Sequence, residues 1–229
     1  MPKIQDLPPK NYAMKSTNTG KLAAEILLDC GAVTFRPKQP FKFTSGILSP
    51  IYVDNRYLIS YPGERKKIIK LFRQLIKNFP KFDILAGCAT AGIPHAAWLA
   101  NELNLPMVYV RSAAKEHGKG SQVEGILARG QKVLVIEDTI STGASSIAVI
   151  SALRKMGADI VGEVAIYTHT FRTAQDNFKK AKVKLETITS LQDVAEAAKS
   201  RGLLKQDQVN MILAWAKDPK GWGKKMGFE

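Results

Sequence analysis

Two adjacent acids, Glu137 and Asp138, follow an apolar run at residues 133–136 and come shortly before a hydroxyl- and glycine-containing turn at residues 141–144. We expect a strand, a turn and then a helix here. In open α/β sheets, ligands bind beyond the carboxyl ends of the strands. Backbone N–H groups of a small-residue turn, together with the N-terminus of the next helix, favour a phosphate group.

The acids themselves cannot favour a phosphate. Carboxylates suit the hydroxyl groups of a sugar, or a Mg²⁺ ion held directly or through water. A phosphate on one side and a hydroxylated ring on the other describe a ribose 5-phosphate. The alternative is an ordinary polar turn in which a serine caps the following helix.

A second candidate anion site is the small-residue segment 87–94, which follows a short apolar run at residues 82–86. Small residues allow the backbone to approach a ligand closely, and Pro94 suits the first turn of a helix. We expect His95 to be a helix residue rather than a ligand, and Cys88 to be a small buried apolar residue.

A third cluster combines Arg111, at the end of the predicted strand 106–110, with Lys115 and His117. Gly118 and Gly120 give this segment hinge points. Cations on such a segment would meet an anionic ligand, and closing it would exclude water. The alternative is a solvated surface loop.

These segments resemble the type I phosphoribosyltransferases. Residues 133–146 (VLVIEDTISTGASS) are similar to the signature that binds phosphoribosyl diphosphate (PRPP). Three further segments are similar to parts of orotate phosphoribosyltransferases: residues 41–56 to the N-terminal hood, residues 87–94 to the pyrophosphate loop, and residues 110–120 to the mobile catalytic loop. The four segments occur in the family's order.

The resemblance implies transfer of the phosphoribosyl group of PRPP to orotate, with release of pyrophosphate, in de novo pyrimidine (UMP) biosynthesis. It implies that Lys115, His117 and Asp138 are catalytic. It places PRPP on Arg111, Lys115, His117, Glu137, Asp138, Thr139, Ile140, Ser141, Thr142, Gly143, Ala144 and Ser145. The pyrophosphate loop would comprise Ala89, Thr90, Ala91 and Gly92, and orotate would contact Ser141, Thr44, Ser45 and Gly46.

The resemblance also implies a Mg²⁺ cofactor held mainly through PRPP, with no direct protein ligand assigned. It implies a homodimer in which the catalytic loop reaches the neighbouring subunit's site. Ser112 and Thr44 stand where some members carry lysines, which removes two candidate cations from the pyrophosphate side. His169 and Arg172 follow a predicted strand on the ligand side, but the resemblance gives them no role.

Strands alternate with helices along the chain, which predicts a parallel, doubly wound α/β sheet. We expect strands at residues 82–86, 106–110, 133–136, 160–168 and 183–188. We expect helices at residues 21–29, 95–103, 145–156, 191–200 and 206–217, and another that begins at Pro62. The chain is expected to be a single phosphoribosyltransferase-like domain, with a small N-terminal hood in about residues 1–60, the core sheet in about 80–190, and C-terminal helices and a tail in 190–229.

The 229 residues contain 34 Lys and Arg against 20 Asp and Glu, a formal net charge of +14. Such a charge favours anionic partners without choosing among them. Only two cysteines are present, which argues against a disulfide framework and favours the cytoplasm. No apolar run approaches the roughly 18–20 residues of a membrane span, so no membrane association is expected.

Two other functions remain open. One is a phosphoribosyltransferase for another base, against which the hood segment argues. The other is a regulator that keeps the fold and binds nucleic acid, for which the charge is the only support. The three tryptophans show no interleaving with basic residues, so no nucleic-acid partner is expected.

Overall fold

A computed structural model describes residues 18–43, 46–112 and 122–228. Its centre is a six-stranded sheet in the order β10-β9-β8-β5-β6-β7. The strands are β5 (Ile84–Cys88), β6 (Met107–Val110), β7 (Val123–Glu124), β8 (Lys132–Ile140), β9 (Asp159–Thr168) and β10 (Leu185–Ser190).

All neighbouring strands pair in parallel except β7, which runs antiparallel to β6 at the sheet's edge. This confirms the predicted α/β class and corrects it in one respect, because the sheet is mixed at that edge. The strand β7 was not predicted. It is only two residues long, too short to leave a periodic signal in the sequence.

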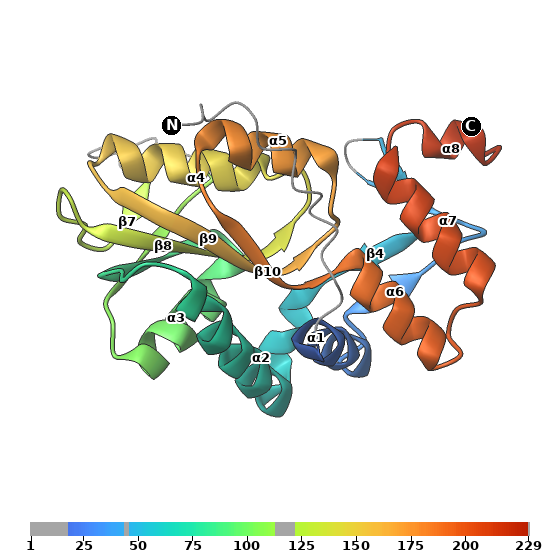
Figure 1. The fold of residues 1–229 in the computed structure, drawn as a ribbon, viewed down its shortest axis with the longest axis horizontal. Helices are drawn as coiled ribbons and strands as arrows, with labels where there is room; N and C mark the ends of the chain where they lie inside the picture. The colour runs from blue at the N-terminus through green and yellow to red at the C-terminus, as the bar shows by residue number, and fades with distance from the viewer. Residues whose placement is uncertain (1–17, 44–45, 113–121, 229) are drawn as a thin grey trace, which may run out of the picture.

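Helices cover both faces of the sheet (Figure 1). One face carries α4 (Ala144–Lys155) and α5 (Arg172–Ala181), and the other carries α1 (Asn18–Asp29), α2 (Pro62–Leu75) and α3 (Gly92–Leu103). Beyond the end of β10 follow α6 (Leu191–Ser200), α7 (Gln206–Lys217) and α8 (Trp222–Lys225). The short helices α5 and α8 were not predicted, and α3 begins three residues before the predicted start.

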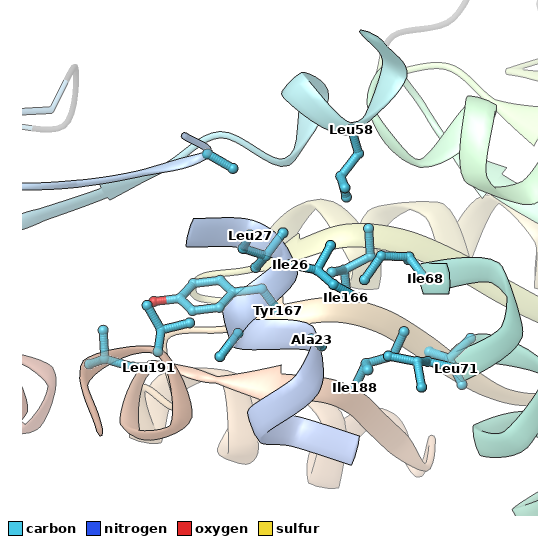
Figure 2. Close-up of a cluster of buried hydrophobic side chains, with 14 of the residues drawn as sticks. Ala23, Ile26, Leu27, Leu58, Ile68, Leu71, Ile166, Tyr167, Ile188 and Leu191 are labelled. Carbon is cyan, nitrogen blue, oxygen red and sulfur yellow. The ribbon is translucent and has the colours of Figure 1, made fainter. Parts of the chain in front are cut away.

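The larger hydrophobic core lies on the α1–α2–α3 face. Figure 2 shows Ala23, Ile26 and Leu27 of α1 against Ile166 and Tyr167 of β9, all of them buried. A second core fills the space under α4 and α5. Because both faces are covered, the middle of β8 is buried throughout and shows no polar alternation.

The hood is built from two small antiparallel ladders. One pairs β1 (Val33–Phe35) with β4 (Ile51–Val53), and the other pairs β2 (Phe41–Lys42) with β3 (Leu48–Ser49). The 3₁₀ helix η1 (Asn55–Ser60) leads from the hood to α2, and η2 (Ile76–Asn78) follows α2. The hood contacts the C-terminal helices through β3, whose Leu48 carbonyl accepts a hydrogen bond from the Trp215 indole of α7 at 2.8 Å.

Across the described residues, no helix combines the length and apolarity that crossing a membrane would need.

Candidate active site

The acid pair lies within β8 and not after it. The sequence predicted a strand that ends at Ile136, but β8 continues through Glu137, Asp138 and Thr139 to Ile140. The neighbouring strand β9 pairs with it as far as Ile140, and His169 N–H donates to the Ile140 carbonyl at 3.0 Å. Pairing to a long neighbour therefore extends the strand into residues that are polar in sequence.

The two acids lie in different environments. Glu137 is buried, and its Oε1 accepts a hydrogen bond from the Asp138 N–H at 2.9 Å. Burial, and then the adjacent Asp138, raise the pKa of Glu137 well above its usual range. Asp138 is only partly buried, and its Oδ2 accepts a hydrogen bond from the Thr139 hydroxyl at 3.1 Å. Asp138 is therefore the acid that a ligand can reach.

The segment Ser141 to Ser145, which we call the phosphate turn, carries the chain from β8 into α4. Ser141, Ala144 and Ser145 are exposed, and Gly143 is left-handed at φ 74°. The helix begins at Ala144, one residue earlier than predicted, and its N-cap Gly143 makes no side-chain capping bond. The N-cap is therefore not a serine, although the Thr142 hydroxyl accepts a long hydrogen bond from the Ala144 N–H at 3.4 Å, and the turn lies at a helix N-terminus, where backbone N–H groups favour an anion.

The pyrophosphate loop, residues 89–92, follows β5 and packs closely on β8. Its peptide bond between Ala89 and Thr90 is cis. A Cβ atom at Gly92 would lie 2.5 Å from the Ile136 carbonyl oxygen and 3.3 Å from Glu137 Oε1. Only glycine permits this approach, which brings the loop directly against the acid pair.

Arg111 follows β6, the next strand of the sheet. The Ala89 N–H donates to the Val110 carbonyl at 3.0 Å, so the start of the pyrophosphate loop lies beside Arg111. The Arg111 guanidinium lies 3.6 Å from Glu124 Oε1 and remains 40% exposed. This carboxylate partner was not predicted, because Glu124 lies on the unpredicted strand β7.

The structure therefore gathers the acid pair, the phosphate turn, the pyrophosphate loop and Arg111 at the carboxyl ends of three adjacent strands, β6, β5 and β8. The other predicted cations, Lys115 and His117, lie outside the described residues, as do Thr44 and Ser45. Gly46 is described: it is exposed and left-handed at φ 82°, and its N–H donates to the Phe43 carbonyl at 2.8 Å. Its predicted contact with orotate stays a prediction.

Two asparagines at this site were missed. The Asn55 side chain is fully buried and donates to the Asp138 carbonyl at 2.9 Å and to the Thr139 hydroxyl at 2.8 Å. The Asn177 side chain donates to the Thr142 carbonyl at 3.0 Å, across from α5 to the phosphate turn. No local sequence signal could have found them, because each bonds to a backbone carbonyl far away in the chain.

Comparison with known proteins gives the family. A sequence profile described as a phosphoribosyl transferase domain matches residues 60–201. The orotate phosphoribosyltransferase of Coxiella burnetii is 48% identical over 200 residues, 87% of this chain and 96% of that protein. The chain belongs to the orotate phosphoribosyltransferase family. The member from Enterococcus faecalis is 45% identical over 209 residues, 91% of this chain and all of that protein.

Solved structures agree with this membership. The orotate phosphoribosyltransferase of Aeropyrum pernix is 28% identical with a TM-score of 0.69, and the match covers 80% of this chain and 99% of that one. The UMP synthase of Leishmania donovani is 27% identical with a TM-score of 0.74 over 86% of this chain, which spans only 42% of that protein. The fold is that of the type I phosphoribosyltransferases, as predicted.

His95 is a helix residue, as expected from the sequence, and His169, for which no role was predicted, is also buried. His95 lies buried in α3 with its ring edge against Trp98, and burial lowers the pKa of His95 to about 4. His169 is buried between Phe171, Trp215 and Tyr167, and its Nδ1 lies 3.0 Å from the Tyr167 hydroxyl. Both rings belong to the core, and Cys88 is likewise fully buried.

No set of three or more His, Cys, Asp or Glu side chains within residues 18–43, 46–112 and 122–228 could hold a metal ion. The partly exposed Asp138 beside a phosphate turn nevertheless fits a Mg²⁺ ion that is carried on a phosphorylated ligand. Mg²⁺ usually keeps several waters and takes one or two carboxylates in addition to substrate phosphates.

Proposed function

We propose that this chain transfers the phosphoribosyl group of PRPP to N1 of orotate, giving orotidine 5′-monophosphate and pyrophosphate, within UMP biosynthesis. The observation that carries the proposal is the junction at Gly92, where the pyrophosphate loop lies against an acid pair that runs directly into the phosphate turn. A ligand with a diphosphate, a hydroxylated ring and a further phosphate matches that order.

The phosphate turn would hold the 5-phosphate of PRPP through backbone N–H groups and the N-terminus of α4. Asp138 would accept hydrogen bonds from the ribose hydroxyls and stabilise positive charge that develops on the ribose ring. Glu137, whose pKa is raised by burial and by the adjacent Asp138, would contact the ribose hydroxyls beside Asp138. Ser141 and the hood residues Thr44, Ser45 and Gly46 would contact orotate.

Arg111, Lys115 and His117 would stabilise the departing pyrophosphate. Such contacts accelerate the reaction most when they strengthen as negative charge develops in the transition state. The Arg111 guanidinium lies 3.6 Å from Glu124 on the edge strand β7, while the backbone just before Arg111 bonds to the start of the pyrophosphate loop. We include in the proposal a homodimer whose subunits share the segment that carries Lys115 and His117.

Mg²⁺ would enter with PRPP and neutralise part of the diphosphate charge. Asp138 is the described carboxylate best placed to add a protein contact. A cytoplasmic location is also part of the proposal, supported by the two free, buried cysteines, Cys30 and Cys88.

One assay tests the proposal: pyrophosphate release from PRPP and Mg²⁺ with orotate, and in parallel with adenine, guanine, hypoxanthine and uracil. We expect turnover with orotate alone. Turnover with another base and not with orotate would mean that this other base is the substrate. No turnover with any base, together with a salt-dependent shift on DNA or RNA, would instead support the nucleic-acid regulator.

A further inference from the structure

We propose that Asn55 is a positioning residue that orients the catalytic carboxylate of Asp138 through the hydroxyl of Thr139. The inference rests on the proposed binding of the PRPP ribose hydroxyls by Asp138. It adds a residue outside the strand, the turn and the loops that contact the substrate.

The hydrogen-bond directions define a relay. The Thr139 hydroxyl has one proton, and it donates that proton to Asp138 Oδ2 at 3.1 Å. The same hydroxyl oxygen accepts from Asn55 Nδ2 at 2.8 Å. A bond to the oxygen's lone pair fixes the rotation of the hydroxyl, and so aims its proton at the carboxylate.

The same amide nitrogen also donates to the backbone carbonyl of Asp138 at 2.9 Å. Because a carbonyl oxygen only accepts, this contact settles which end of the Asn55 amide is the nitrogen. Asp138 is therefore held from one side chain at two places, its carbonyl directly and its carboxylate through Thr139.

Burial argues against a role in packing alone. Asn55 is fully buried, yet its Oδ1 has no hydrogen-bond partner in the part of the chain that the structure describes. An unsatisfied buried acceptor costs free energy that an apolar side chain of the same shape would avoid. The two donated bonds, both directed at Asp138 and Thr139, are what the asparagine adds over such a side chain.

The geometry also fits the place of Asn55 in the fold. It is the first residue of η1, near the end of the hood segment 41–56, and it lies 83 residues from Asp138 in the sequence. The relay therefore couples the hood to the ribose side of the site. A displaced hood would leave the Thr139 hydroxyl free to rotate away from the carboxylate.

The test measures the Kd of PRPP by calorimetry with Mg²⁺ and no orotate, in Asn55→Ala, Asn55→Leu, Thr139→Val and the double variant Asn55→Ala/Thr139→Val. Leucine keeps the shape of asparagine without either bond. We expect each single variant to raise the Kd about tenfold, the size of one lost hydrogen bond to a charged group. The double variant should add less than about threefold to either, because both break one relay.

Asn78→Ala is the matched control. Asn78 also donates a long-range side-chain bond, to Glu186 at 2.8 Å, but far from the acid pair, and its loss should leave the Kd unchanged. Urea unfolding of every variant separates lost affinity from lost fold.

Three outcomes would overturn the relay. They are wild-type affinity in both Asn55 variants, multiplying effects of Asn55→Ala and Thr139→Val, or failure of both Asn55 variants to fold while Asn78→Ala folds. If the wild-type chain binds PRPP but does not consume orotate, the proposed function is wrong, and the Kd values of the variants still test the relay.

Discussion

The acid strand and the hood meet at the same site but are held in place by different means. From Lys132 to Lys155, one continuous segment supplies strand, acids, phosphate turn and helix, and the sheet ladder fixes it. The hood lies in two short ladders, and single side chains tie it to the rest: Asn55 to Asp138, and Trp215 to the Leu48 carbonyl at 2.8 Å, 167 residues away. The acid strand should therefore tolerate loss of any one side-chain contact better than the hood does.

The two regions also differ in where their charged groups lie. Beside the acid strand, Glu163 of the neighbouring strand β9 is fully buried, and burial raises its pKa to about 8. The hood's ionised pair, Asp54 with Arg56, lies at the surface, where the Arg56 side chain is 61% exposed. The acid strand and its neighbour β9 therefore keep the carboxyl groups of Glu137 and Glu163 out of water, while the hood keeps the charge of Arg56 in it.

The largest expected effect is that of Asp138→Asn, which removes the reachable charge and leaves the strand unchanged. We expect kcat to fall about 10³-fold, the size of losing a stabilising group in the transition state. Asp83→Asn is the control, because Asp83 accepts from the Lys132 N–H at the opposite end of β8. Circular dichroism should show both variants folded. Loss of folding in Asp138→Asn would assign Asp138 a structural role.

The next effect concerns the free energy of unfolding and involves Glu163, beside the acid strand. Because the pKa of Glu163 rises from 4.5 to about 8 on folding, the unfolded chain releases this proton first, and stability falls as the pH rises through that range. Glu163→Gln cannot ionise, so it should be more stable than wild type by roughly 3 kcal/mol at pH 7.

Urea unfolding at several pH values checks this. The gap between Glu163→Gln and wild type should close near pH 4, where the carboxyl is protonated in both states. A gap that is constant with pH would mean that Glu163 has the same pKa in the folded and the unfolded chain, and that water reaches its carboxyl group despite its burial.

Lys115→Ala extends the comparison to a third segment, whose role is inferred from the family resemblance. We expect kcat to fall about 10²-fold while the Kd of orotate stays within about threefold, since the lysine would act on the departing pyrophosphate. Lys67→Ala, on the surface of α2, is the control. Unchanged turnover in Lys115→Ala would reject the assigned role.

A smaller effect is expected for Trp215→Phe, which removes the indole N–H that anchors the hood. The KM for orotate should rise about fivefold, with the KM for PRPP nearly unchanged, for the loss of one neutral hydrogen bond. Trp222→Phe is the matched control, because the buried Trp222 N–H has no hydrogen-bond partner among the described residues. Equal effects of the two variants would mean that the anchor does not position the hood.

The smallest effect is expected for Asn177→Ala, the equivalent change on the acid-strand side. It removes one donor to the Thr142 carbonyl, but the phosphate turn is still held by β8 and α4. The KM for PRPP should rise about twofold, less than the change in the orotate KM of Trp215→Phe. A rise in the PRPP KM larger than the rise in the orotate KM of Trp215→Phe would mean that the acid strand tolerates the loss of a side-chain contact less well than the hood does.

The sequence by itself determined the α/β class and the places of the phosphate turn and the pyrophosphate loop at the ends of strands. These features are local: each is a run of neighbouring residues whose periodicity, small side chains or charge defines a strand end or a helix start. The C-terminal helices α6 and α7 were predicted with the bounds they have, for the same reason.

Only the tertiary structure decided the length of β8, the antiparallel strand β7 and the two asparagines at the site. Strand β8 continues through polar residues because β9 beside it offers hydrogen-bond partners as far as Thr168. Asn55 acts on Asp138 only because the chain folds η1 against the end of β8. A hydrogen bond between residues 83 positions apart leaves no periodic trace, so its existence depends on the packing that brings its two ends together.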